Sequence, residues 1–385
     1  MPSSSPVYLD YNATAPLKPA AQAAMVAAME LTGNPSSVHR FGRLARRQLE
    51  DARAKVAALV GAQPSQVVFT SGGTEANVLA ITGSGRGSAL VSAIEHDSLR
   101  AAMGRLPRGV EIAVESGGVV DLVALDHMLG DKGGEALVSV MIANNETGVV
   151  QPIAEIVALA HERGALVHCD GVQAVGKLHI DMSALAIDLM TVSSHKLGGP
   201  AGVGALILRE GLDLMPLMVG GGQERRRRGG TENLIGIAGF GAAAAQAVDD
   251  IADQSRLAAL RDRIEGGVRS LAPTAQIFGE QATRLANTTC LTMPGVASEI
   301  QVMALDLAGV AVSAGAACSS GKVAASHVLR AMGVPEAEAA TAIRVSLGWR
   351  STIADVDAFL VAWGELYARA GLGDRGMGDR SAPAA

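Results

Sequence analysis

The stretch SSHKLGGPAG, residues 193–202, decides the fold of this chain. It follows an almost entirely apolar run at 186–192, which predicts a buried strand. Ser193, His195 and Lys196 therefore stand where a strand leaves its sheet, beside glycines that let other groups approach closely. A lysine held at a strand end in this way suits an amine nucleophile that forms a Schiff base with a carbonyl group.

Working outward from this stretch, strand-like apolar runs alternate with helix-length segments. The predicted strands are 67–70, 89–92, 110–114, 136–141, 166–170, 189–193 and 203–208. The predicted helices between them include 74–82, 97–106 and 153–163. This alternation predicts an α/β fold with a mostly parallel sheet covered by helices. Ligands of such sheets bind at the carboxyl ends of the strands, where Lys196 falls.

The pattern changes in the last third of the chain. Residues 242–271 predict one long helix, and they are followed by predicted strands at 275–278 and 288–293 and a helix at 298–308. This order is typical of a smaller α+β domain.

We therefore expect two domains. Residues 12–250 form the large domain in this prediction, and residues 1–11 and 251–370 form the small one. The tail 371–385 is rich in Gly, Asp, Arg, Ser and Pro, so we expect it to be disordered.

The amino-acid composition and net charge of the chain exclude some classes of function. The chain has 385 residues, is 49% hydrophobic and carries a net charge of −6, which argues against nucleic acid or an anionic membrane as its main partner. Neither a signal peptide nor a membrane span is predicted. Cys169, Cys290 and Cys318 are odd in number and contain no CxxC, so we expect no disulfide framework, no metal site and a reducing cytoplasm.

A predicted phosphate site follows the strand 67–70. There, Ser71-Gly72-Gly73-Thr74 opens a helix, whose free N–H groups and positive end suit a phosphate, with the Thr74 hydroxyl as a further donor. Taken alone, the same residues would also suit an ordinary threonine cap after a tight turn.

An acid and an amide follow the strand 166–170. Asp170 ends that strand and Gln173 lies just beyond it. A carboxylate here suits a protonated pyridine nitrogen, and together with Lys196 and a phosphate loop it predicts pyridoxal 5'-phosphate (PLP) as cofactor. The alternative for Asp170 alone is a helix cap.

Two further polar residues follow predicted strands. His96 suits a ring that stacks on the cofactor and moves protons, although a lone loop histidine often has no such role. Asn145 suits an amide that bonds the ring oxygen of the cofactor, or an Asx-turn.

Three more residues, in the second half of the chain, are candidates for the site. Thr231 stands beside two glycines after the run Arg225–Arg228, whose role the sequence leaves open. Arg344 lies in an apolar run and must be paired, either with protein or with a substrate carboxylate. Cys318 lies among small residues, which favours an exposed nucleophile over a structural cysteine, whereas Cys169 and Cys290 are expected in the core.

Together these motifs resemble the cysteine desulfurases, PLP enzymes of the class V aminotransferase group, in the bacterial branch that feeds iron–sulfur assembly. Matching segments begin at 7–16 and 33–37 and end at 346–348. The resemblance implies a PLP-dependent transferase of fold type I, acting as a cytoplasmic homodimer. It implies that L-cysteine is converted to L-alanine, with the sulfur held as a persulfide on Cys318 for an acceptor protein such as an iron–sulfur scaffold.

The resemblance also implies roles for the site residues. Lys196, Cys318 and His96 would be catalytic. The cofactor would be bound by Gly73, Thr74, Asn145, Asp170, Gln173, Ser193, His195, Lys196 and Thr231, with Thr231 reaching over from the neighbouring subunit. Arg344 would bind the substrate carboxylate with help from Asn34.

Two features depart from the family. Val323-Ala324-Ala325 stands where members often have Leu-Glu-Pro, and we expect the chain to lack the C-terminal extension that docks a scaffold protein in housekeeping members. A selenocysteine lyase of the same fold is the main alternative. A small-substrate aminotransferase would have no use for Cys318, and a non-catalytic scaffold would not need Lys196 and Asp170.

Overall fold

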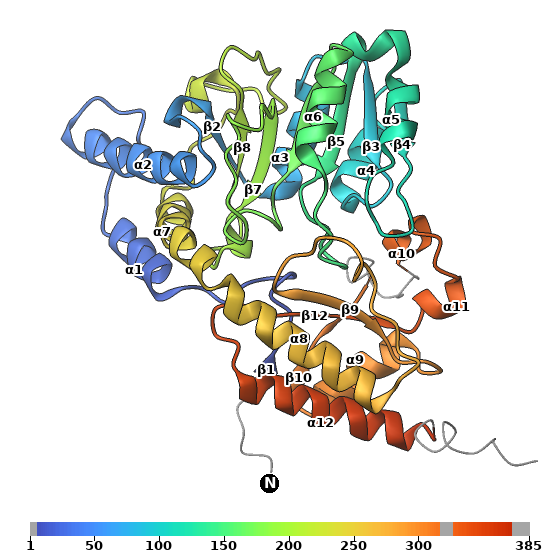
Figure 1. Ribbon diagram of the computed structural model, residues 1–385. Helices are drawn as coiled ribbons and strands as arrows, with labels where there is room; N and C mark the ends of the chain where they lie inside the picture. Colours follow the sequence, from blue (N-terminus) through green and yellow to red (C-terminus); the bar gives the residue numbers. More distant parts are fainter. Residues whose placement is uncertain (1–5, 316–325, 372–385) are drawn as a thin grey trace, which may run out of the picture.

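The computed structural model describes residues 6–315 and 326–371. Its largest sheet has seven strands in the order β2-β8-β7-β6-β5-β3-β4 (Figure 1). Their bounds are β2 Val67–Thr70, β8 Gly204–Leu208, β7 Leu189–Ser193, β6 Leu166–Asp170, β5 Ala136–Met141, β3 Ser88–Ser92 and β4 Arg108–Ile112. The neighbours from β7 to β4 pair in parallel, and β8 pairs antiparallel with both β2 and β7. The predicted α/β class is therefore confirmed.

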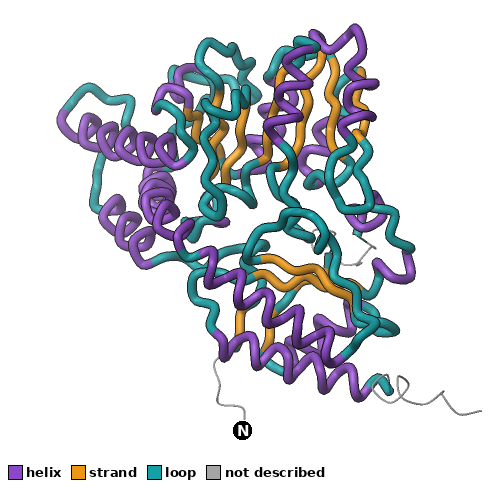
Figure 2. The backbone as a smooth tube through the Cα atoms, viewed as in Figure 1, coloured by secondary structure: helices purple, strands orange, loops and turns teal. Residues whose placement is uncertain are grey.

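Both faces of this sheet are buried beneath helices, as Figure 2 shows. The helices are α1 Pro19–Met29, α2 Arg40–Leu59, α3 Gly73–Gly83, α4 Asp97–Met103, α5 Leu122–Leu129, α6 Ile153–Glu162 and α7 Leu234–Ala252. Successive strand residues belong to different hydrophobic clusters, with Phe69 and Ile207 facing α2, α6 and α7 and Val68 and Leu206 facing α3 and α4. This alternation explains why the strands are apolar throughout.

A second body of structure carries its own core. Strands β11 Ser313–Ala314, β12 Ala342–Ser346 and β9 Thr288–Thr292 form an antiparallel sheet. The helices of this C-terminal part are α8 Gln254–Leu271, α9 Ser298–Leu307, α10 His327–Ala331, α11 Glu336–Ala339 and α12 Ile353–Arg369. Phe359 and Trp363 of α12 are fully buried in this core.

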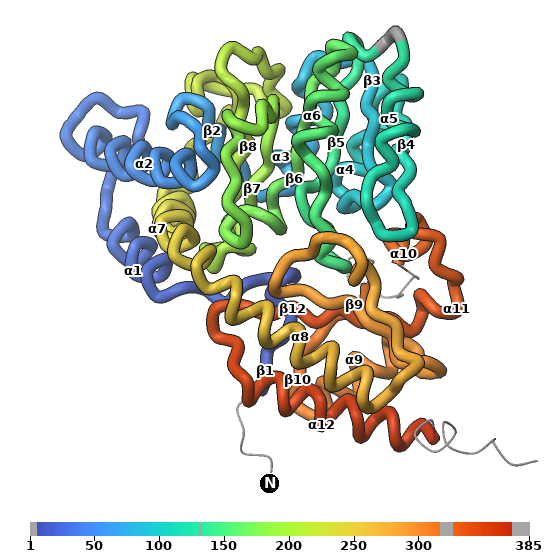
Figure 3. Tube along the Cα trace, viewed as in Figure 1, coloured from blue at the N-terminus to red at the C-terminus, as the bar shows by residue number. Residues whose placement is uncertain are grey.

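The N-terminal strand joins this second body. Strand β1 Val7–Tyr8 pairs in parallel with β10 Val310–Ala311, and Leu9 lies in the same core (Figure 3). The assignment of residues 1–11 to the small domain stays a prediction. The division at residue 250 stays a prediction, and most of the tail 371–385 lies outside the described residues.

Two sequence predictions were wrong in the C-terminal part. The predicted helix 242–271 is two helices, α7 and α8, which meet at Asp253, because this short acidic residue favours a helix end and its carboxylate bonds Arg256. The predicted strand 275–278 makes only an isolated bridge from Ile277 to Leu291, because the preceding residues turn back on themselves through Ala275 N–H and Ala272 C=O.

Helix α7 is a core helix. Among the described helices it is long and apolar enough by length and composition to cross a membrane, but half of it is buried inside the protein. Its buried residues include Ile237, Phe240 and Ala244, and it packs against α1 and α2. Its apolar composition is therefore explained by its place in the core.

A buried ion pair connects α2, β2 and the arginine-rich loop. Arg53 Nη1 and Nη2 donate to Glu224 Oε2 and Oε1 over 2.7 and 2.8 Å, and both side chains are almost fully buried. Glu224 also accepts from Phe69 N–H, and Arg53 donates to Val67 C=O. The pair thus anchors the loop before Arg225 to the edge of the main sheet.

We predict that Arg53→Met lowers the free energy of unfolding by about 3–5 kcal/mol, because it leaves the Glu224 carboxylate buried without its cation. Chemical denaturation measures the change. The control is the double variant Arg53→Met/Glu224→Leu, which removes both charges and should recover part of the loss. An equal loss in both variants would show that packing, and not the ion pair, is responsible.

Candidate active site

The site lies at the carboxyl ends of the parallel strands, facing the antiparallel sheet. Asp170 ends β6, Ser193 ends β7, and Lys196 closes the 3₁₀ turn Ser194–Lys196 that follows β7. The phosphate loop follows β2 and packs directly on the strand after this turn, because a Cβ at Gly204 would lie 2.6 Å from the carbonyl carbon of Gly72. The close approach explains the glycine at 204.

A hydrogen-bonded chain links two of the predicted residues, Asp170 and His96. Asn77 Nδ2 donates to Asp170 Oδ2 over 2.8 Å and to Ser98 Oγ over 3.0 Å. Ser98 Oγ lies 2.9 Å from His96 Nδ1, which also accepts from Ser98 N–H. Because Nδ1 accepts, a neutral His96 carries its proton on Nε2. Asp170 accepts a further bond from Val172 N–H, so its carboxylate is held at two points.

Lys196 is held by backbone oxygens. Its Nζ donates to Asn12 C=O over 2.5 Å and to Ala13 C=O over 2.8 Å. The neighbouring His195 bonds the Thr14 hydroxyl through Nδ1 over 2.7 Å. Burial, with a smaller effect of the Lys196 charge, lowers the pKa of His195 to about 4, so this imidazole is neutral at pH 7.

The predicted phosphate ligands Gly73, Thr74 and Ser193 come together beside this turn. Gly73 and Thr74 are the first residues of α3, and no described side chain caps this helix. A Cβ at Gly73 would lie 3.5 Å from Ser193 Cβ, so the helix start and the end of β7 are in contact. The open helix N-terminus leaves donors for an anion.

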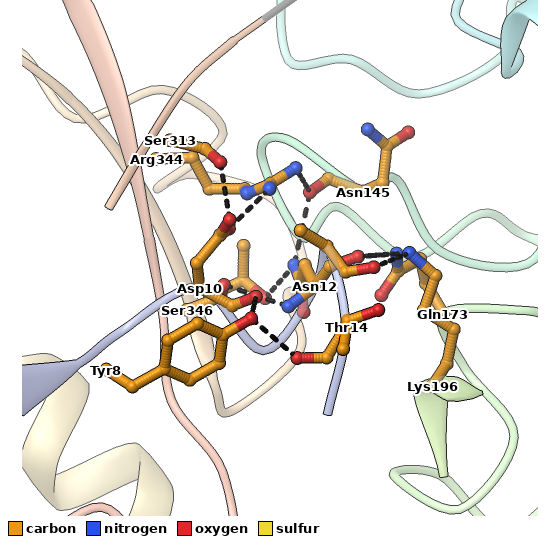
Figure 4. A network of polar contacts seen from close by, with 12 residues as sticks. Tyr8, Asp10, Asn12, Thr14, Asn145, Gln173, Lys196, Ser313, Arg344 and Ser346 are labelled. Carbon is orange, nitrogen blue, oxygen red and sulfur yellow. Dashed lines mark hydrogen bonds and ion pairs between the residues drawn. The ribbon is translucent and has the colours of Figure 1, made fainter. Parts of the chain in front are cut away.

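Arg344 of β12 bonds the N-terminal segment and the loop after β5 (Figure 4). It is 4% exposed, and its Nη2 donates to Asp10 Oδ1 over 2.7 Å while Nη1 donates to Asn145 C=O over 3.1 Å. Ser313 Oγ donates to the other Asp10 oxygen. Arg344 Nε is buried without a hydrogen-bond partner among the described residues. The side-chain amide of Asn145 points away from these contacts (Figure 4).

Gln173 and Asn12 complete the centre of the site. Gln173 Nε2 donates to Asn12 C=O over 2.9 Å, the same oxygen that accepts from Lys196. Asn12 Nδ2 donates to Asn145 C=O and to Thr288 Oγ1, and Asn12 N–H donates to Ser346 Oγ. The N-terminal segment therefore ties the strand ends of the main sheet to β9 and β12.

Three predicted residues are not joined to this centre. Asn34 is exposed between α1 and α2, and its amide oxygen accepts from Ser36 N–H in its own loop. Thr231 is exposed and lines a hollow with Ser71 and Arg228 on the outer side of the phosphate loop. Cys318 lies outside the described residues.

The remaining cysteines and arginines are structural. Cys169 and Cys290 are fully buried free thiols, as expected. Arg228 pairs with Glu75, whose other oxygen accepts from Ser71 N–H, so this arginine braces the phosphate loop. Arg225 and Arg227 both donate to Ser65 C=O.

Comparison with known proteins places the chain. Residues 7–359 match the model described as Aminotransferase class-V. The chain belongs to this family. It is 45% identical over 366 residues to a cysteine desulfurase of Cereibacter sphaeroides, covering 92% of this chain and 94% of that protein. An IscS-like cysteine desulfurase of Mycobacterium tuberculosis is 41% identical over 379 residues, covering 94% and 96%.

Solved structures agree with this assignment. The X-ray structure of a NifS-like protein from Rickettsia africae is 37% identical, with a TM-score of 0.88, and the match covers 94% of this chain and 99% of that one. SspA in complex with cysteine is 29% identical, with a TM-score of 0.78, covering 89% and 99%. The protein is thus a PLP-dependent enzyme, as predicted from its sequence.

The residues present fit this cofactor. The open start of α3 suits its phosphate, and the twice-held carboxylate of Asp170 suits its ring nitrogen. Asn77 Oδ1 and Arg344 Nε are buried polar atoms without a hydrogen-bond partner in the described chain, which is typical of a site that is completed by a ligand.

Sequence reasoning missed several residues of the site. Three neutral polar residues orient the predicted ones by hydrogen bonds: Asn77, Ser98 and Asn12. Their residue types do not indicate acid, base or nucleophile chemistry, so their roles can be recognised only from their positions in the structure. Glu95 and Glu146 are buried carboxyls after β3 and β5. In the sequence, both are acidic residues that follow an apolar strand, which indicates a place near the site. This pattern does not show that the two carboxyls are buried.

Glu146 connects the main sheet to both described ends of the segment 316–325. Its Oε2 accepts from Ser326 Oγ over 2.5 Å, and a Cβ at Gly315 would lie 2.7 Å from the same oxygen. Burial raises the pKa of Glu146 to about 7, although Ser326 and the Arg344 charge oppose this shift. The folded protein therefore favours the protonated carboxyl.

We predict that Glu146→Gln becomes progressively more stable relative to wild type as the pH rises from about 4.5 to about 7. The pKa of Glu146 is higher in the folded chain than the value of 4.5 expected without burial, so ionisation between these values destabilises only the wild type. The full difference is about 3 kcal/mol. Chemical denaturation of both proteins across this pH range measures it, and a pH-independent difference would contradict the assignment.

Proposed function

We propose that this protein is a cysteine desulfurase that converts L-cysteine to L-alanine and keeps the sulfur as a persulfide on Cys318. The observation that carries the proposal is that Lys196 and Asp170 lie at the strand ends of the main sheet and Arg344 of β12 bonds Asn145 C=O across from them, in a chain 45% identical to a named cysteine desulfurase. An amine, a ring acid and a carboxylate-binding cation are what an amino acid substrate of a PLP enzyme requires. The names of the relatives favour this activity over selenocysteine lyase.

When bound, PLP supplies an electron sink that makes the Cα proton of an amino acid removable. Asp170, with its carboxylate oriented by Asn77 and by Val172 N–H, would hold the ring nitrogen in its protonated form. Lys196 Nζ would bind the cofactor and would be the base for the Cα proton. His96, oriented by Ser98, presents Nε2 for a second proton transfer.

Arg344 binds the substrate carboxylate in this proposal. Its side chain is already oriented by Asp10 and Asn145, so little rotamer entropy is lost when the substrate arrives. The Nε–H has no described partner, and each NH₂ group of the guanidinium has a second N–H, so donors are left for both oxygens of a carboxylate. The exposed position of Asn34 in this chain does not support the role of helper that the resemblance implies.

The sulfur chemistry rests on the thiolate of Cys318. It attacks the sulfur of L-cysteine, a sulfur–sulfur bond forms, and the carbon–sulfur bond breaks with its electron pair going to carbon. Protonation of that carbon gives L-alanine. The transferred sulfur loses the electron pair of the carbon–sulfur bond and the carbon keeps it, so the carbon is reduced as the sulfur is oxidised and no external oxidant is required. A sulfur-acceptor protein, such as an iron–sulfur scaffold in the cytoplasm, then takes the sulfur.

A homodimer fits the surface around α1, α2 and the loop before the arginines. Val38, Phe41 and Val219 are 87%, 58% and 83% exposed, so this face offers apolar area to a partner. Thr231 lies beyond the same arginine-rich loop. A second copy covering this face would bury these side chains and bring Thr231 toward its phosphate site.

The experiment that tests the function measures sulfide and alanine release from L-cysteine with a thiol reductant, together with the PLP absorbance. We expect Cys318→Ala to keep its PLP band and to lose sulfide release by at least about 100-fold, because the nucleophile is gone. Cys290→Ala removes a buried thiol and is the matched control. Equal sulfide release by wild type and Cys318→Ala would exclude Cys318 as sulfur acceptor.

We further predict that Arg344→Lys raises the KM for L-cysteine by about 10-fold or more, because a lysine cannot bind a carboxylate in the two-pronged manner of arginine. The change in kcat should be smaller. Steady-state kinetics separates the two parameters. A loss confined to kcat would mean that Arg344 acts on the chemical step and not on substrate binding.

A further inference from the structure

Lys177 is a second lysine beside Lys196 to which the reaction assigns no role. Its Nζ lies 3.0 Å from Asn12 Oδ1 and 3.0 Å from Gln173 Oε1. Lys177 and Lys196 line the same small cavity, together with Tyr11 and Trp349. The second amine is therefore inside the site, one side chain removed from the first.

Lys177 contacts the side-chain amides of Asn12 and Gln173 and favours one orientation of each. Asn287 Nδ2 donates to the same oxygen of Asn12, whereas Lys177 is the donor to the oxygen of Gln173. A side-chain amide fits a site with its oxygen and nitrogen in either order, but a lysine amine offers donors to its neighbours. The oxygens of Asn12 and Gln173 therefore turn toward Lys177, and their NH₂ groups turn away from it. Gln173 Nε2 then donates to Asn12 C=O, and Asn12 Nδ2 donates across the site to Asn145 C=O.

The orientation of Gln173 matters because its NH₂ group and Lys196 Nζ meet at one acceptor, Asn12 C=O. If Lys196 binds the cofactor, its Nζ no longer donates to Asn12 C=O. The NH₂ group of Gln173 then remains as a donor next to the bound cofactor. A donor at this place suits the ionised ring oxygen of PLP, whereas the amide oxygen would repel it.

Holding a lysine here is costly. Burial, together with the smaller effects of the Lys196 and Arg344 charges, lowers the pKa of Lys177 to about 7. Within the described chain Lys177 has amide oxygens as partners and forms no ion pair. An apolar side chain would fill the same place without this penalty. We therefore expect the hydrogen bonds that Lys177 donates to have a function in the site.

We propose that Lys177 is a positioning residue that fixes Gln173 as a hydrogen-bond donor to the ring oxygen of PLP. The proposal rests on PLP and on the ring-oxygen role of Gln173, and not on the substrate. The role proposed for Lys177 would therefore hold even if the substrate were another amino acid. If the role is wrong, the proposed desulfurase activity is not affected.

The test follows the absorbance of bound PLP in the holoenzyme as the pH is raised. Loss of a donor to the ring oxygen destabilises its ionised form, so we expect Lys177→Met to raise the midpoint of the spectral change by about 0.5 pH unit or more. Gln173→Met should raise it at least as far. Lys18→Met is the matched control, because Lys18 lines the same cavity but pairs with Asp250 and contacts no amide of the site.

The double variant Lys177→Met/Gln173→Met decides between orientation and charge. If Lys177 acts through Gln173, the double variant has the midpoint of Gln173→Met. If Lys177 acts by its charge alone, Lys177→Met shifts the midpoint equally with and without Gln173, and the proposal is overturned. An unchanged midpoint in Lys177→Met overturns it as well.

A second substitution covers the case in which Lys177→Met does not fold or does not hold PLP. Lys177→Gln removes the charge but keeps an N–H donor, so we expect its midpoint to stay within about 0.2 pH unit of wild type. A midpoint that moves as far as that of Gln173→Met would contradict the proposal.

Discussion

The hydrogen bonds of Asn12 hold the site together. Its side chain donates to the loop after β5 and to β9, its backbone N–H donates to β12, and its carbonyl oxygen accepts from both Lys196 and Gln173. Asn12 is almost completely buried, so these bonds form away from competing water. Asp170 and Lys196 lie at the strand ends of the main sheet, and the hydrogen bonds of Asn12 fix the distance between these strand ends and the antiparallel sheet.

The charges of the site follow from where each group is buried. His195 is neutral, and burial raises the pKa of Glu95 and Glu146, so these carboxyls resist ionisation. Arg344, by contrast, keeps a partner in Asp10. Arg344, which we propose for substrate binding, is thus paired with a carboxylate. Glu95 and Glu146 form no ion pair within the described residues, so burial favours their protonated forms.

The main sheet could be predicted because its strands are apolar on both faces and end at glycines or polar residues. Asp170, Ser193 and Lys196 were predicted for the same reason, since a polar residue at or just after the end of a buried strand is visible in the sequence. The α7–α8 junction was missed because a single Asp253 inside a helical pattern gives little warning. Asn12, Lys177 and Glu146 were missed because their roles arise from contacts between segments distant in sequence.

The antiparallel strand β8 has a consequence for the lysine. Ser193 pairs with Gly204, and Ser194 N–H donates to Val203 C=O, so both ends of the turn that carries Lys196 are fixed in adjacent strands of one sheet. The entropy of closing this loop is therefore lost when the sheet folds, before any ligand arrives. The amine is pre-organised, and cofactor binding does not have to order the backbone beneath it.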